Sequence, residues 1–126
     1  MQGIDRITGR ALGGFDHLIQ SIEVILTTRI GERVMRRTFG SHVPRLLGEK
    51  LITPVVLNFF TAIVIAIEIW EPRYDVISVK TASDSGAADR ARLGRLGVTI
   101  RGNYMPRGHL GDFTISPADG LRDIQL

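Results

Sequence analysis

Residues 53–81 decide the fold: they read TPVVLNFFTAIVIAIEIW, then EPR, then YDVISVKT. Thr53-Pro54 is a strong helix start, with threonine as N-cap and proline at the first helical position. The segment is then apolar on nearly every side up to Trp70, and such a helix has to be covered by several other elements. We therefore expect a helix over 53–70 that is the central element of the core.

The tripeptide Glu71-Pro72-Arg73 follows that helix and precedes a strand. Pro72 disfavours helical geometry at Glu71 and removes a backbone donor, so the helix ends there. A carboxylate at a helix C-terminus opposes the helix dipole, so Glu71 needs a neighbouring cation. Arg73 supplies that cation within the chain, or a partner protein does, and the residues alone leave both open. Residues 74–81 then alternate as a first strand.

Two further helices precede the central one. Over residues 15–29, apolar side chains recur at helical spacing on one stripe: Phe15, Leu18, Ile19, Ile22, Ile25 and Leu26. Gly31 is expected to supply the left-handed residue that closes this helix. Val43-Pro44 opens a short helix of its own.

Strands make up the second half of the chain. Residues 96–104 alternate as a second strand and residues 112–116 as a third. The fold class is therefore α+β: two or three helices around a long central apolar helix, packed on a three-stranded antiparallel β meander. One domain is expected over 15–116, between a flexible N-terminal arm (1–14) and a C-terminal tail (117–126).

Composition bounds the class of protein. The 126 residues are 44% hydrophobic and 23% charged, which fits one globular domain. There is no cysteine, which excludes disulfides and thiolate metal sites. The net charge is +3, but the arginines are scattered and only 6% of residues are aromatic. Without a base-stacking platform, nucleic acid is disfavoured as a partner.

Neither a signal peptide nor a membrane span is predicted. Residues 1–6 lack the charged-then-apolar order of a signal peptide. The apolar stretch 55–70 contains Asn58, Thr61 and Glu68, and it is shorter than the roughly 20 residues that cross a bilayer. The sequence therefore predicts a soluble protein.

The sequence contains no pattern that predicts catalysis, a cofactor or a metal. A glycosidase needs two carboxylates roughly 5 to 10 Å apart across a cleft, whereas Glu68 and Glu71 project side by side on one helix. The three histidines stand far apart and lack partners at metal-ligand spacing. No nucleophile elbow or phosphate loop is present. We expect a protein that is not an enzyme.

A second constellation lies upstream of the Glu-Pro-Arg corner, in a loop with two glycines: Gly31, Glu32, Arg33, Phe39 and Gly40. It combines a glycine turn after a helix, an ion-paired Glu-Arg step, and an aromatic anchor before the second glycine. Its simplest interpretation is a rigid loop clamped to the core by Ile30 and Phe39.

Together these motifs resemble a known family. Residues 21–36 (SIEVILTTRIGERVMR), followed by FGS at 39–41, are similar to the first half of the phage baseplate wedge family. EPR at 71–73, after an apolar helix, resembles the family's second hallmark. The family is called gene 25-like or W-like, carries a lysozyme-like label, and includes the TssE component of type VI secretion. The resemblance covers about residues 15–115.

The resemblance implies a structural role. Family members sit, in multiple copies around the axis, in the virion tail baseplate of a contractile phage or a related injection device, assembled in the bacterial host cytoplasm. It implies that Glu71, Pro72 and Arg73 dock on the core bundle of the wedge subunits, and that the tail sheath starts to assemble on this platform. Hub, spike or tube-proximal proteins are further candidate partners, whereas nucleic acid and membrane are not.

The sheet edge is the expected contact with the sheath. A short meander leaves at least one edge with unpaired N–H and C=O groups, onto which another chain can add a strand. We expect that edge at the third strand: Asp112, Phe113, Thr114, Ile115 and Ser116.

Two alternative functions stay open. One is an anti-adaptor-type protein-binding module of the same fold, and the other, less favoured, is a peptidoglycan hydrolase.

Overall fold

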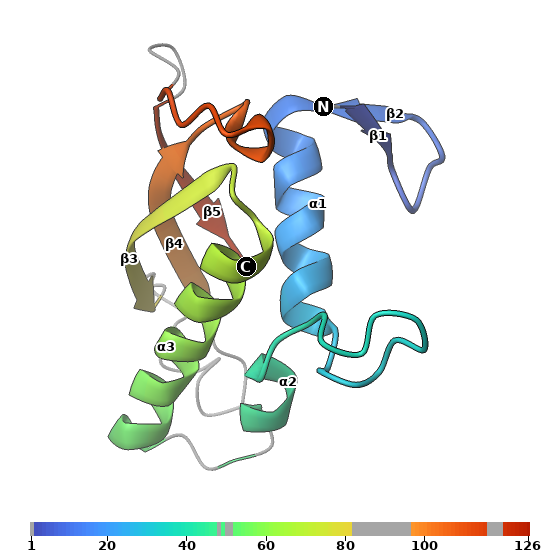
Figure 1. Ribbon diagram of the computed structural model, residues 1–126. Coiled ribbons are helices and arrows are strands. Elements are labelled where there is room, and N and C mark those ends of the chain that lie inside the picture. The colour runs from blue at the N-terminus through green and yellow to red at the C-terminus, as the bar shows by residue number, and fades with distance from the viewer. Residues whose placement is uncertain (1, 48, 50–51, 82–96, 116–119) are drawn as a thin grey trace.

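The computed structural model describes residues 2–47, 49, 52–81, 97–115 and 120–126. Two long helices lie beside a three-stranded antiparallel sheet, and a two-stranded hairpin projects from the start of the first helix (Figure 1). The α+β class predicted from the sequence is confirmed.

The helices form where the hydrophobic periodicity predicts them. α1 spans Gly14–Thr27, α2 spans Val43–Leu46 and α3 spans Thr53–Trp70. Each long helix buries one apolar stripe, made of Leu18, Ile22, Ile25 and Leu26 in α1 and of Phe59, Ile63, Ala66 and Ile67 in α3. The sheet completes this single core with Tyr74, Val98, Ile100, Tyr104 and Ile124.

The main sheet has the strand order β3-β4-β5 and is antiparallel throughout. β3 spans Tyr74–Thr81, β4 spans Val98–Tyr104 and β5 spans Leu121–Gln125. β3 and β4 confirm the strands predicted at 74–81 and 96–104, with β4 starting at Val98 and residue 96 outside the described residues. A register shift between Val76 and Ser78 interrupts the pairing of β3 with β4. In the described part of the chain, β3 and β5 are the edge strands.

The predicted third strand at 112–116 is wrong, because the third strand is β5. Asp112, Phe113, Thr114 and Ile115 have no strand pairing, and Ser116 lies outside the described residues. The Asp112 carboxylate explains the difference: it accepts the Thr114 N–H at 3.1 Å and the Thr114 hydroxyl, so it closes a turn. The expected C-terminal tail therefore contains a sheet strand, in which Ile124 alone is buried.

The expected N-terminal arm forms a β-hairpin. β1 (Gln2–Ile4) pairs with β2 (Ala11–Gly13) in antiparallel register. Asp5 organises the turn, since its carboxylate accepts the Ile7 N–H at 2.9 Å and the Thr8 hydroxyl at 2.6 Å. This side-chain turn chemistry supplies regular structure where no hydrophobic period is visible in the sequence.

α3 departs from the prediction in two respects. Ile52 rather than Thr53 occupies the N-cap, and no side chain caps the helix. The helix also leaves one face uncovered: Leu57, Ile65 and Ile69 are 60%, 50% and 63% exposed. The sheet, α1 and α2 cover the remaining faces. Among the described residues, α3 alone is long and apolar enough to cross a membrane by length and composition, and 22% of it is buried.

Candidate functional site

The Glu71-Pro72-Arg73 corner holds a buried ion pair. Arg73 Nε lies 2.6 Å from Glu71 Oε1, and Arg73 Nη2 donates to Glu71 Oε2 at 2.8 Å. Both residues are 3% exposed, and they are the only buried charged residues in the described part of the chain. Pro72 between them is exposed. The fixed proline angle turns both flanking side chains inward to the same place, where two parallel hydrogen bonds satisfy them.

A third side chain completes this pair. Arg73 Nη1 lies 3.0 Å from His17 Nδ1, on α1. Arginine only donates, so Nδ1 accepts and the imidazole is neutral with its proton on Nε2. Burial, and next the positive charge of Arg73, lower the pKa of His17, against the opposing effect of Glu71. A Cβ at Gly3 would overlap the other side of the imidazole ring, so the hairpin packs directly on it.

The backbone around the corner is equally constrained. A Cβ at Gly108 would overlap the carbonyl oxygen of Pro72, so only glycine fits at that point of the 3-10 turn Gly108–Leu110. The Met105 N–H donates to the Arg73 carbonyl at 2.8 Å. The hydrogen bonds to Glu71 raise the pKa of Arg73, with burial acting in the opposite direction. The corner therefore joins α1, α3, β3 and the segment after β4.

The structure thus shows the local ion pair that the sequence left as one of two possibilities. Neither carboxylate oxygen of Glu71 is left without an arginine donor. Docking of these residues on a partner protein stays a prediction.

The loop between α1 and α2 differs from its expectation in two details. Gly31 does not close α1: the Thr28 N–H caps the helix on the Val24 carbonyl, and Gly31 (φ +90°) turns the loop further on. Glu32 and Arg33 do not pair with each other. The Glu32 carboxylate accepts the Arg29 N–H at 2.9 Å, while the Arg33 guanidinium lies 4.1 Å from the Phe39 ring centre.

The loop is anchored at its second glycine and its aromatic ring. Gly40 has φ +127°, and a Cβ there would lie 2.5 Å from the Thr28 carbonyl oxygen. The Phe39 ring contacts Trp70, with 5.0 Å between ring centres. Because Trp70 directly precedes Glu71, this contact brings the two sequence motifs to the same end of α3. Of the two anchors expected, Phe39 packs on the core, whereas Ile30 is 46% exposed.

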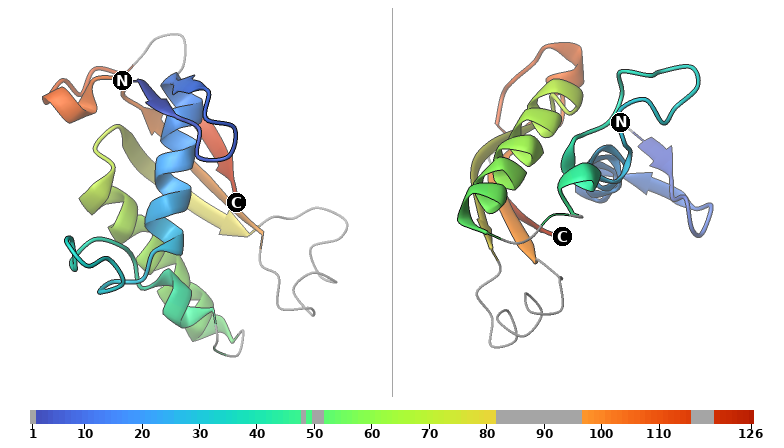
Figure 2. Two further views of the ribbon diagram at one scale, coloured as in Figure 1. Left: turned by 90° about the vertical axis from the view of Figure 1, so that its right-hand side faces the viewer. Right: turned by 90° about the horizontal axis from the view of Figure 1, so that it is seen from below.

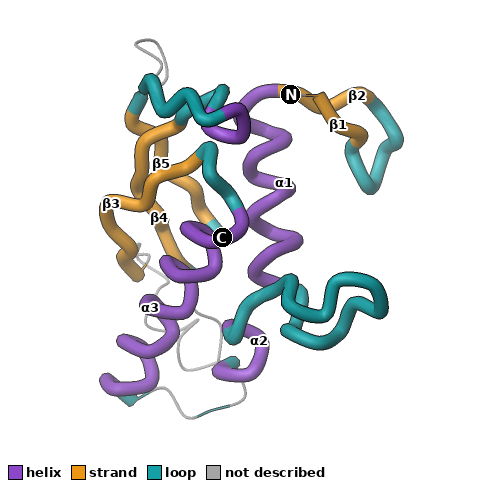
Figure 3. Tube along the Cα trace, in the orientation of Figure 1, coloured by secondary structure: helices purple, strands orange, loops and turns teal. Residues whose placement is uncertain are grey.

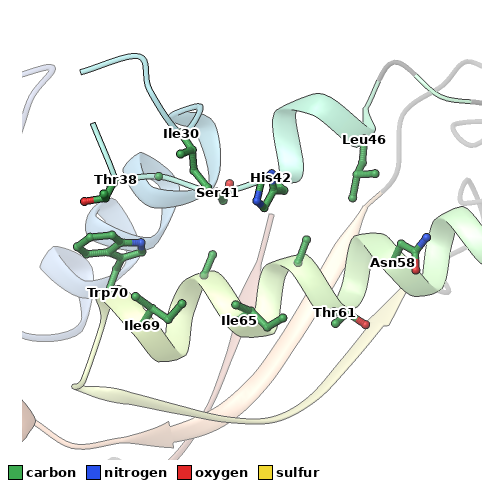
Figure 4. Close-up of a pocket in the computed structure, with 13 residues that line it drawn as sticks. Ile30, Thr38, Ser41, His42, Leu46, Asn58, Thr61, Ile65, Ile69 and Trp70 are labelled. Atoms are coloured by element: carbon green, nitrogen blue, oxygen red, sulfur yellow. The ribbon is translucent and has the colours of Figure 1, made fainter. Parts of the chain in front are cut away.

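A groove runs along α3 between this helix and the loop with α2 (Figure 4). Its volume is about 540 Å³, and its lining is mainly apolar. In Figure 4, Ile65, Ile69 and Trp70 form the α3 side, and Ile30 and Leu46 lie opposite. This groove was not predicted from the sequence, although the uniformly apolar character of α3 could also have indicated an uncovered face.

The described residues do not gather a metal-ligand cluster. No cluster of three or more histidine, aspartate or glutamate side chains is present among them. Glu68 is exposed on α3, whereas Glu71 is buried in the ion pair.

Comparison with known proteins gives the same family from sequence and from structure. Residues 14–105 match the family model described as baseplate wedge protein gp25. Baseplate protein W of Escherichia phage P2 is 34% identical over 113 residues, which cover 90% of this chain and 92% of that protein.

Two solved structures share the fold. A chain of the postcontracted pyocin R2 baseplate is 30% identical with a TM-score of 0.64, covering 82% of this chain and 98% of that one. A protein of Geobacter sulfurreducens, named as a tail lysozyme, is 25% identical with a TM-score of 0.66, covering 90% and 89%. This chain therefore belongs to the family of the baseplate wedge protein gp25.

Proposed function

We propose that this chain is a structural subunit of the tail baseplate of a contractile phage or a related injection device. The observation that carries the proposal is the match across 14–105, because this range includes both the loop motif and the Glu-Pro-Arg corner. The relatives from phage P2 and pyocin R2 are named as baseplate components. The chain acts in the virion, in several copies around the tail axis.

Within the baseplate, the corner at 71–73 docks on the core bundle of the wedge subunits. Its charged side chains are satisfied by each other, so they act by fixing the end of α3 against β3 and by presenting the exposed Pro72. Docking on a rigid surface loses less conformational entropy than docking on a mobile one, which favours a corner built in this way.

The sheath starts on an edge of the main sheet, and β5 replaces the edge expected from the sequence. The Val98 and Leu126 amides exchange hydrogen bonds, so the alternate residues Leu121, Asp123 and Gln125 direct their backbone groups away from β4. These outward groups suit the addition of a strand from a sheath subunit.

The role is non-enzymatic, despite the lysozyme name of one structural relative. In the Glu-Pro-Arg corner, Arg73 binds both oxygens of Glu71, so this carboxylate is not available to protonate a glycosidic oxygen. Incubation of the purified chain with peptidoglycan tests this part of the proposal, and release of soluble fragments above the level of a denatured control would contradict it.

Co-expression tests the docking role. The chain is produced together with wedge subunits of the same phage or injection device, and a stable complex is expected on size-exclusion chromatography. A chain that stays free of wedge subunits but binds a response-regulator-like protein would instead support the anti-adaptor alternative.

A further inference from the structure

We infer that the groove between α3 and the loop with α2 is a docking site for an acidic amphipathic helix of a partner protein. Three observations carry this inference: the apolar floor, the basic residues beside it, and the helical backbone of α3, which offers no strand edge. The inference deepens the proposed function, on which it rests for the source of the partner.

The floor of the groove is apolar and exposed. Thr61, Ile65 and Ile69 line the groove and stand four residues apart on α3, so they form one row along the helix, which Leu57 continues beyond the groove. The three apolar members are at least half exposed. Contiguous exposed apolar surface on a folded domain marks an interaction site, because its burial against a partner is favourable.

The dimensions suit three turns of a helix. From Asn58 to Trp70 the groove follows about 18 Å of α3, at roughly 1.5 Å per residue. Phe39 packs on Trp70 at one end and so forms a rigid aromatic wall. α3 has its backbone groups bonded within the helix, so an occupant is recognised by side chains and cannot add as a strand.

Basic side chains lie beside the groove on the loop side, because Arg29 and Arg45 line a neighbouring depression that shares Ile30, Ser41 and His42 with the groove. The segment 28–47 contains five arginines and one glutamate: Arg29, Arg33, Arg36, Arg37, Arg45 and Glu32. Glu32 already accepts a backbone N–H within the loop. The five arginines are exposed, and Figures 2 and 3 show this loop projecting beside α2, away from the sheet. A helix with apolar residues toward α3 and carboxylates toward the loop is complementary to this surface.

The charge also decides between occupants. A second copy of the chain would bring two of these basic surfaces together, which is repulsive. An anionic membrane surface is the competing partner for an apolar face with a basic border, and it is included as an outcome of the test.

The test uses designed helical peptides of about 14 residues, long enough for three to four turns. One carries leucines on one face and glutamates beside them, a second carries lysines in place of the glutamates, and a third is a scrambled form of the first. Trp70 is the only tryptophan of the chain and lines the groove, so its emission reports occupancy. Anionic vesicles of phosphatidylglycerol and phosphatidylcholine are titrated in parallel.

Two groove variants are compared with matched controls. Ile69→Gln removes an exposed apolar side chain from the ridge, and Ile7→Gln makes the same change at an 83% exposed site on the hairpin. Arg29→Glu with Arg45→Glu reverses the charge beside the groove, and Arg10→Glu reverses an exposed charge on the hairpin. Circular dichroism checks that each variant is folded.

The acidic peptide is expected to bind the unaltered chain at least about tenfold more tightly than the lysine peptide does. Its affinity is expected to fall by about tenfold in both groove variants and to stay unchanged in the controls. Equal binding of both peptides, no binding below about 1 mM, or tighter binding to vesicles overturns the inference. Groove-dependent dimerisation in sedimentation overturns it as well. If Ile69→Gln still co-purifies with wedge subunits while no peptide binds, the groove assignment fails and the proposed function stands.

Discussion

Removing one partner of the Glu71–Arg73 pair is the most informative perturbation of the fold. Arg73→Met keeps much of the side-chain volume but leaves the Glu71 carboxylate buried without its two donors. Breaking a buried ion pair on one side costs about 3–5 kcal/mol. A domain of 126 residues has a total stability of roughly 6–19 kcal/mol, so this is a large share of it.

Urea unfolding followed by circular dichroism measures this loss. We expect the free energy of unfolding to fall by about 3–5 kcal/mol with an unchanged denaturant slope, and the melting temperature to fall by roughly 10–20 °C. The double variant Glu71→Leu with Arg73→Met removes both charges, so it is expected to recover most of the loss.

Two results would refute this reasoning. One is a single variant whose stability lies within about 1 kcal/mol of the unaltered chain. The other is a double variant as unstable as the single one, since the cost would then not come from a stranded carboxylate. A stable Arg73→Met that no longer docks on wedge subunits would show that the charge itself contacts the partner.

The pKa of His17 is lowered in the folded state, so the unfolded chain takes up the proton first as pH falls. The contribution of His17 to the free energy of unfolding is therefore complete above the ordinary pKa of 6.5 and is lost as pH drops below it. Urea unfolding at several pH values checks this, and His17→Gln should flatten the dependence; an unchanged slope would contradict it. Gly108→Ala should lower the free energy of unfolding by about 1–3 kcal/mol, because the added Cβ overlaps Pro72. Gly13→Ala should have little effect in the same assay, because its Cβ would lie 3.7 Å from the nearest atom. Similar losses in both variants would contradict the packing argument. Gln125→Pro should leave the domain folded but block sheath growth on assembled baseplates, because it removes an outward backbone donor of β5. The control variant Gln125→Thr keeps that donor and should support growth. Sheath growth on the proline variant would exclude strand addition at this position.

Much of the fold follows from local sequence signals. The period of apolar residues in α1 and the proline at each end of α3 determine those helices, since both depend on neighbours within one turn. β3 and β4 alternate clearly. β5 was missed because Leu121–Gln125 carries only one buried side chain, and its position depends on pairing with distant β4.

The candidate site was predictable in part. The sequence identifies the corner and an ion pair as one possibility, because Glu71 needs a cation near the helix end. It does not reveal His17 as the third member, since that contact joins residues 56 apart in the chain. The groove was missed for a related reason: an apolar helix shows that a face must be covered, but not whether this chain or a partner covers it.

The most direct test of the baseplate role is reconstitution of this chain with the purified wedge subunits, followed by light scattering on the separated complex. A stable complex is expected at micromolar concentration. Ile69→Gln is expected to weaken this complex, whereas the hairpin control Ile7→Gln is expected to leave it unchanged. A chain that remains monomeric in the presence of folded wedge subunits would contradict the baseplate role.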